Sequence, residues 1–179
     1  MYYTGNIIYD IYIYIIWNNY STDNTENIIK NFDNIRHTLE KMSDIGCPLC
    51  VHGEVTHDDV DIFDREAVFI EKILHPVRLN IPDLKIVFEH ITTIDAIEYV
   101  RSAEKNLAAT ITTHHLFINR SHIFMDGIRP HYYCLPILKK EQDRKSLVEA
   151  ATSGSQNFFL GTDSAPHHID DKESECGCA

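Results

Sequence analysis

Three short apolar runs of the chain each lead into a side chain that can bind a metal ion. They are residues 48–51 before His52, residues 86–88 before His90, and residues 158–160 before Asp163. Runs of about four to six β-prone residues fit buried strands. Because the carboxyl ends of neighbouring parallel strands meet at one edge, three such endings predict one site at the top of a parallel β/α barrel.

Helical patterns alternate with the apolar runs. Strands are expected at 47–52, 85–90, 107–111 and 157–162, and helices at 28–45, 58–79, 93–102 and 140–153. Gly46 is placed to end the first helix. Asp58 or Asp59 is expected to cap the second helix, and Thr92 or Thr93 the third. Each connection is long enough for a crossover helix, so the strands should be parallel and adjacent in an α/β fold.

Length and composition limit the classes of protein that fit. With 179 residues, 44% of them hydrophobic, the chain fits a single domain over 1–179, and no linker divides it. A complete β/α barrel usually needs about 250 residues, so an incomplete one is expected. The net charge of −11 argues against a nucleic-acid partner.

Targeting signals are not evident. The apolar run at 7–17 is too short to span a bilayer, and no Lys or Arg precedes Lys30, so neither a membrane segment nor a signal peptide is expected. The five cysteines are an odd number and fit free thiols in a reducing compartment. A cytoplasmic protein is therefore the expectation.

Four ordered motifs carry a resemblance to a known family. They are VHGEVTH at 51–57, FEHITT at 88–93, YCLPILK at 133–139 and GTDSAPH at 161–167. These motifs resemble dihydroorotase, the bacterial-type, single-function enzyme of the amidohydrolase superfamily, over residues 19–179; residues 1–18 do not match. The resemblance implies a partial TIM (β/α)8 barrel with its first strands missing. It also implies a zinc-dependent cyclic amide hydrolase that interconverts N-carbamoyl-L-aspartate and (S)-dihydroorotate in pyrimidine synthesis.

The resemblance also implies which residues do the chemistry. His52 and His90 would bind one zinc ion, and Asp163 would bind a second and carry the proton between the bridging hydroxide and the leaving nitrogen. A pair of zinc ions lowers the pKa of bound water and polarises the carbonyl. The residues implied to contact the substrate are Ser21, Thr22, Leu135, His167 and Ala179.

Each of these positions has a simpler interpretation. A single strand histidine is more often a core side chain that donates to a backbone carbonyl. His167 would then be a surface histidine, Leu135 a core leucine and Ala179 a frayed terminus. Of the remaining histidines, His114 and His115 follow the strand at 107–111, and one of them is expected to support the ligands.

The ligand set of the family is incomplete in this sequence. No His-x-His occurs, the strand at 12–17 lacks the bridging lysine, and the Arg and Asn that hold the substrate carboxylate are absent. Three ligands stand where the family uses six, so at most one zinc ion is expected, weakly held. The chain therefore resembles the second half of a dihydroorotase, which leaves open a fragment, an aberrant gene model or a decayed copy.

Two functions follow from this resemblance. The first is a dihydroorotase acting on a small-molecule substrate, with a homodimer left open and this chain inactive alone. The second is a non-catalytic half-barrel that binds metal weakly or serves only in an interaction. The presence of His-x-His and the lysine in a flanking coding sequence would separate the two.

Overall fold

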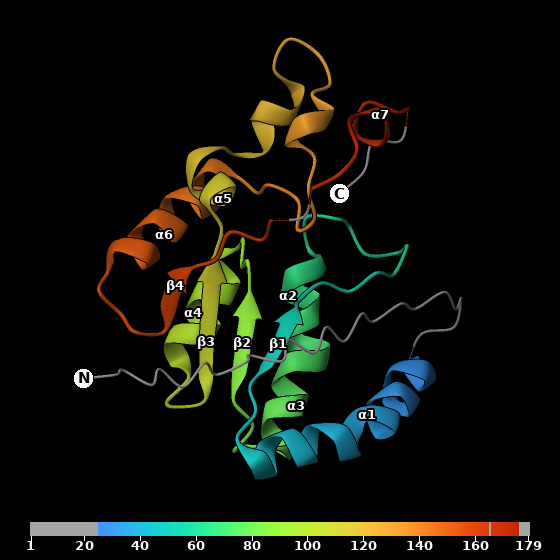
Figure 1. Cartoon of the computed structure of the whole chain (residues 1–179), viewed down its shortest axis with the longest axis vertical. Coiled ribbons are helices and arrows are strands. Elements are labelled where there is room, and N and C mark those ends of the chain that lie inside the picture. The colour runs from blue at the N-terminus through green and yellow to red at the C-terminus, as the bar shows by residue number, and fades with distance from the viewer. Residues whose placement is uncertain (1–24, 165, 176–179) are drawn as a thin grey trace, which may run out of the picture.

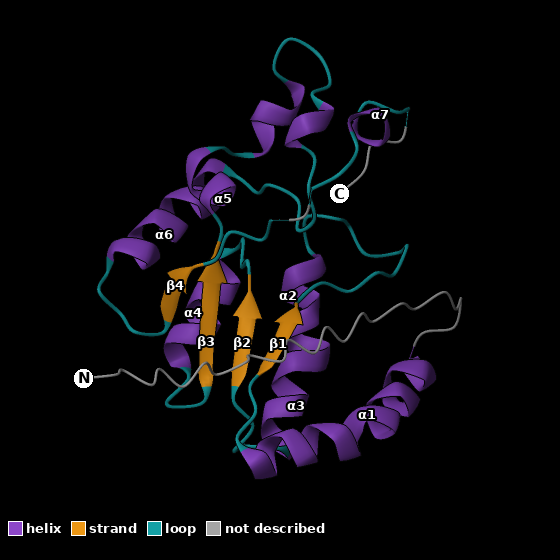
Figure 2. Cartoon of the chain, in the orientation of Figure 1, coloured by secondary structure: helices purple, strands orange, loops and turns teal. Residues whose placement is uncertain are grey.

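The computed structural model describes residues 25–164 and 166–175, with side chains described from residue 35 onward. Four strands form one parallel sheet in chain order: β1 (Leu49–His52), β2 (Ile86–Glu89), β3 (Leu107–Ile111) and β4 (Phe158–Leu160). All four arrows point the same way, so their carboxyl ends share one edge (Figure 2). The expected strands and their parallel, adjacent order are confirmed.

Helices follow each of the first three strands and precede the fourth. They are α1 (Thr25–Ile45), α2 (Arg65–Phe69), the π-helix η1 (Ile70–Leu74), α3 (His75–Asn80), α4 (Ile94–Ser102), α5 (Thr113–Phe117), the 3-10 turns η2 (Arg120–Phe124) and η3 (Pro130–Tyr132), α6 (Glu141–Thr152) and α7 (Ile169–Lys172). Figure 1 shows α2, α3 and α4 behind the sheet. The arrangement is that of part of a β/α barrel.

The strands alternate between a face packed on helices and a more open face. Ile86 and Phe88 of β2 and Ala109 of β3 are buried, whereas Val87 and Ala108 between them are only half-buried. The buried set forms one core with the helices. Its members include Leu39, Met42, Leu74, Val77, Ile97, Val100, Ile111 and Leu147. Burial of this apolar surface, at about 25 cal/mol per Å², is the main force that holds the helices to the sheet.

Three helix ends agree with the sequence. Gly46 follows α1 with a left-handed φ of +70°, the conformation that favours glycine at a helix end. Thr93 caps α4, because its hydroxyl accepts a hydrogen bond from the amide of Ala96 at 3.1 Å. Gly154, also left-handed at +76°, follows α6.

The predicted helix at 58–79 is wrong at its start. The helical run begins at Arg65, and residues 57–64 form turns instead. The Asp61 carboxylate accepts a hydrogen bond from the amide of Phe63 at 2.8 Å, and the Asp61 carbonyl accepts one from Asp64 at 2.9 Å. Aspartate side chains compete in this way with helical hydrogen bonds, so the acidic run ends up before the helix.

A long excursion between β3 and α6 lies over the carboxyl edge of the sheet (Figure 1). It is held by a second apolar cluster, in which Ile123, Ile137 and Leu138 are buried and Phe63 and Tyr132 pack against them. The excursion therefore lies above the edge at which the site was predicted. Within the described part of the chain, no helix is long and apolar enough to cross a membrane. The apolar run at 7–17 lies outside the described residues.

Replacing Gly53, which directly follows β1, tests this packing. A Cβ atom at Gly53 would lie 1.9 Å from Cε2 of the Phe88 ring, which is fully buried. We expect Gly53→Ala to lower the free energy of unfolding by about 1–3 kcal/mol, as overpacking of cores does. Urea unfolding measures this. Adding Phe88→Leu should recover part of the loss, and strict additivity of the two changes would contradict the predicted contact.

Candidate metal and substrate site

Two histidine rings face each other at the carboxyl ends of β1 and β2. Nδ1 of His52 lies 3.2 Å from Nε2 of His90, with the ring centroids 4.7 Å apart. Two ligands on a tetrahedral zinc ion, with bonds of about 2.0–2.1 Å, have nitrogens roughly 3.3 Å apart. The predicted proximity of the two rings is confirmed, and the donor pair fits a shared metal ion.

The backbone at His90 and Asp163 is unusual. Both residues follow a strand and have left-handed φ values, +42° and +46°, which non-glycine residues rarely adopt. At His90 the amide donates to Oγ1 of Thr110 on β3 at 2.6 Å. Strained conformations of this kind concentrate at functional sites, where the surrounding contacts hold them.

Glu54 fixes the orientation of the His52 ring. Its Oε2 lies 3.3 Å from Nε2 of His52, and its side chain is buried, whereas the side chain of His52 is 43% exposed. A carboxylate has no proton to donate, so this ion-pair contact favours the proton of His52 on Nε2. The lone pair then remains on Nδ1, which accepts the hydrogen bond from Nε2 of His90 at 3.2 Å; a metal ion between the rings would take the place of that proton. Carboxylates commonly orient metal-binding histidines in this way.

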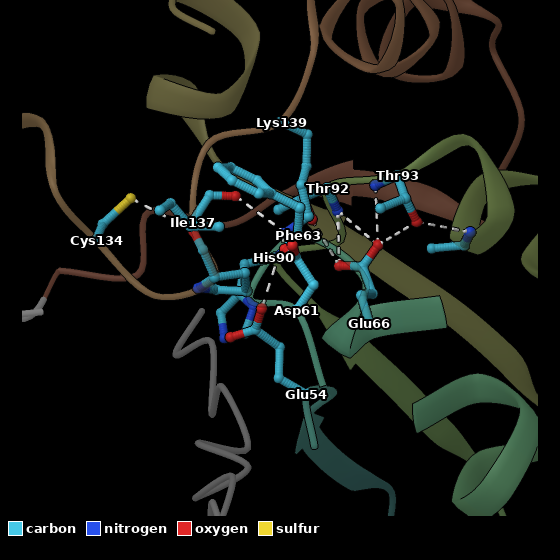
Figure 3. A network of polar contacts seen from close by, with 12 residues as sticks. Glu54, Asp61, Phe63, Glu66, His90, Thr92, Thr93, Cys134, Ile137 and Lys139 are labelled. Atoms are coloured by element: carbon cyan, nitrogen blue, oxygen red, sulfur yellow. Dashed lines mark hydrogen bonds and ion pairs between the residues drawn. The ribbon is translucent and has the colours of Figure 1, made fainter. Parts of the chain in front are cut away.

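Glu66 holds the turn that follows His90. Its fully buried carboxylate accepts hydrogen bonds from the amides of Thr92 at 2.9 Å and Thr93 at 2.8 Å, and from both threonine hydroxyls. Figure 3 shows this group beside His90. The contacts join α2 to the start of α4, so the position of His90 is set by two elements besides its own strand.

The electrostatics keep His90 neutral. Burial first, and the neighbouring His52 ring second, lower the pKa of His90 to about 3. A metal ion binds the neutral imidazole, so this histidine needs no deprotonation near neutral pH. The chemistry of the residue therefore suits a ligand.

Asp163, Leu135 and His167 line one hollow beside the excursion. The other residues that line it are His114, His131, Cys134, Ile169 and Lys172. Asp163 acts on the pKa of His114 and of Glu89, so it lies within electrostatic range of the ends of β2 and β3. Asp163, implied to bind metal, thus shares this hollow with Leu135 and His167, implied to contact the substrate, whereas His52 and His90 do not line it.

A second group of possible ligands lies nearby. The ligand atoms of His114, His115 and Cys134 all fall within 4.8 Å of one another. In His115, however, Nδ1 contacts the hydroxyl of Thr112 and Nε2 lies 3.0 Å from the carbonyl of Pro136. Burial also raises the pKa of the Cys134 thiol to about 11, which disfavours the thiolate that metals bind. Metal binding here would have to break existing hydrogen bonds.

The structure brings some of the predicted site residues together and does not describe others. His52 and His90 meet directly, and Asp163, Leu135 and His167 meet in the hollow. Ser21, Thr22 and Ala179 lie outside the described residues. Sequence reasoning missed Glu54 and Lys139 as supporting residues. Glu54 lies two residues after His52 in the 51–57 motif, and Lys139 ends the 133–139 motif. Membership of these motifs is the only feature of the sequence that could have indicated them.

The parallel β/α sheet, with facing imidazoles at its carboxyl edge, resembles part of a TIM barrel of the amidohydrolase class. Within that class the similarity is to dihydroorotases. The chain is 60% identical over 159 residues to the dihydroorotase of Ruegeria sp. (strain TM1040), which covers 89% of this chain and 46% of that protein. The dihydroorotase of Vibrio parahaemolyticus is 56% identical over the same length. No family model matches the chain.

Solved structures agree with the sequence matches. A dihydroorotase from Campylobacter jejuni superposes with a TM-score of 0.70 at 43% identity, over 76% of this chain and 39% of that one. The Saccharomyces cerevisiae dihydroorotase in complex with 5-fluoroorotic acid gives 0.72 at 32% identity, over 83% and 43%. The chain is thus a dihydroorotase homologue that spans under half the length of the relatives it matches.

The buried histidines make stability depend on pH. Burial, followed by His114, lowers the pKa of His115 to about 3. The unfolded chain takes up this proton near pH 6.5 and the folded chain does not, so stability falls as the pH drops from about 6.5 towards 3. We expect His115→Gln to flatten this slope by at most about 1.4 kcal/mol per pH unit. Urea unfolding at pH 4.5, 5.5 and 6.5 measures the slope.

The exposed His37 on α1 offers a matched control. We expect His37→Gln to leave the slope as in the parent chain. Equal slopes for His115→Gln and the parent would contradict the buried, neutral state of His115.

Proposed function

We propose that the chain carries part of a zinc-dependent dihydroorotase site, in which His52 and His90 hold one metal ion. The 3.2 Å separation of Nδ1 of His52 and Nε2 of His90 carries this proposal. Two features support it: Glu54 leaves the His52 lone pair facing His90, and burial keeps His90 neutral. A bound zinc ion would supply an activated water molecule and a polarised carbonyl.

The hollow that Asp163 lines is proposed to receive the substrate. Its carboxylate, Asp163, would accept the proton of the nucleophile and return it to the leaving nitrogen, as a general base and acid. His167 and Lys172 are the basic groups proposed to attract the carboxylates of carbamoyl aspartate or dihydroorotate. The backbone at Leu135 would hold the ring amide. The yeast relative was solved with 5-fluoroorotic acid, a pyrimidine carboxylate, which fits this substrate class.

The ligand count favours a site that this chain does not complete by itself. Two imidazoles suffice for weak binding of one ion, and the sequence has no His-x-His for a second. We therefore propose metal binding without turnover for the 179-residue polypeptide. The same count favours the second candidate, a non-catalytic metal-binding half-barrel.

Metal binding tests the first part of the proposal. We expect His52→Ala and His90→Ala each to weaken zinc or cobalt binding by more than about tenfold, since each removes one of two ligands. Isothermal titration with the full chain measures the affinity. The matched control is His57→Ala, which changes a histidine of the same motif and should bind as the parent does. Equal affinities for all four proteins would contradict the proposed ligands.

Turnover tests the second part. We expect no dihydroorotate to form from carbamoyl aspartate at mildly acidic pH, with or without added zinc. Loss of one member of a set of catalytic groups that act together removes most of the catalytic rate. The bridging lysine of the family has no counterpart in the strand at 12–17 of this sequence. Chromatographic detection of dihydroorotate measures this. Zinc-dependent turnover that disappears with His90→Ala would show that the chain completes an active site.

A further inference from the structure

Lys139 is a buried ammonium group that lies between two buried carboxylates. Its side chain is 3% exposed, and its Nζ donates to the carbonyl of Ile137 at 3.1 Å. Figure 3 shows Lys139 in one network with Glu54, His90, Glu66 and Thr92. Burying an unpaired charge costs several kcal/mol, so the groups that pair with the Lys139 ammonium group indicate its role.

The first partner is Glu54, whose two oxygens have different neighbours. Oε1 lies 3.8 Å from Nζ of Lys139 and has no hydrogen-bond partner in the described structure, whereas Oε2 lies 3.3 Å from Nε2 of His52. The attraction of Lys139 for Oε1 holds the carboxylate in the rotation that turns Oε2 towards His52. The chain of contacts therefore runs from Lys139 through Glu54 to His52.

The second partner is Glu66. Burial raises the pKa of this carboxyl, and the charge of Lys139 is the largest of the influences that oppose the rise. Glu66 in turn accepts the amide hydrogens of Thr92 and Thr93, the turn that follows His90. The same ammonium group thus acts on the carboxylates behind both imidazoles, through an ion pair with Glu54 and through its charge on Glu66.

We propose that Lys139 is a positioning residue that, through Glu54 and Glu66, orients the facing nitrogens of His52 and His90 for one metal ion. The inference rests on the proposed function, because it names what supports the same two histidines. The geometry favours orientation over general stability as its role. Replacing a whole buried ion pair by apolar side chains costs little stability, but removing Lys139 alone leaves the buried Glu54 carboxylate without its charged partner, so Lys139→Met is expected to be less stable than the parent chain.

The test compares Lys139→Met with Lys140→Met in the full chain. Both changes remove one positive charge at neighbouring positions, but Lys140 is exposed. We expect Lys139→Met to weaken zinc binding by about 10- to 100-fold, as loss of groups behind metal ligands does. Lys140→Met should change it by less than about twofold, because exposed charges contribute little. Circular dichroism verifies that both variants are folded.

A second readout needs no metal. Nitrogen-15 NMR of the metal-free chain distinguishes which ring nitrogen of His52 carries the proton. We expect the proton on Nε2 in the parent chain and in Lys140→Met, and a mixture of the two tautomers in Lys139→Met. A purely structural role for Lys139 would lower thermal stability without changing this tautomer.

A double-mutant cycle shows whether Lys139 acts through Glu54. In Glu54→Gln the side-chain oxygen can still accept from His52, but its charge is gone. If the two residues act together, Lys139→Met combined with Glu54→Gln should lose less zinc affinity than the sum of the single losses. In the double variant Glu54 is uncharged and Glu66 keeps its hydrogen bonds to Thr92 and Thr93, so it serves if Lys139→Met alone does not fold.

The outcomes separate the two proposals. If the parent chain binds no zinc, the proposed function is overturned. The tautomer of His52 then still tests whether Lys139 orients this ring. A folded Lys139→Met chain with parental zinc affinity and a parental tautomer overturns the role of Lys139 while the metal site stands. A parent chain with the proton on Nδ1 of His52 also overturns it.

Discussion

The buried carboxylate of Glu66 holds the carboxyl edge of the sheet together. It accepts the amides and hydroxyls of Thr92 and Thr93, and it sits on α2, so it joins the helix after β1 to the turn after β2. Without it, several buried donors would lose their partners, each at a cost of about 1–3 kcal/mol. The left-handed backbone of His90, which directly precedes this turn, depends on that anchor.

The order and direction of the strands could be predicted, because each apolar run marks a buried strand and each connection is long enough for a crossover helix. Neighbouring parallel strands end at one edge, so the proximity of His52 and His90 could be predicted, although His52 lies opposite Glu89 in the register and His90 has a left-handed backbone. The start of the second helix could not be predicted. Asp61 offers its carboxylate to a nearby amide, and helical periodicity does not show which of two local hydrogen-bond patterns wins.

The polar contacts behind the ligands were beyond sequence reasoning for a different reason. Glu54 and Lys139 lie far apart in the chain, and no local pattern says that the excursion after β3 brings them together. The motifs indicated that certain residues belong to one site, as the hollow of Asp163, Leu135 and His167 illustrates. They gave no information about which oxygen faces which nitrogen, since that depends on packing between distant segments.

The contact between His52 and His90 joins two neighbouring strands whose backbones are paired residue by residue, with His52 opposite Glu89. An ion shared by these rings would act as a cross-link that forms only in the native register. Binding to the folded chain alone stabilises it by an amount that grows with the free metal concentration. A higher free metal concentration would then raise the fraction of this polypeptide that is folded, independently of any substrate.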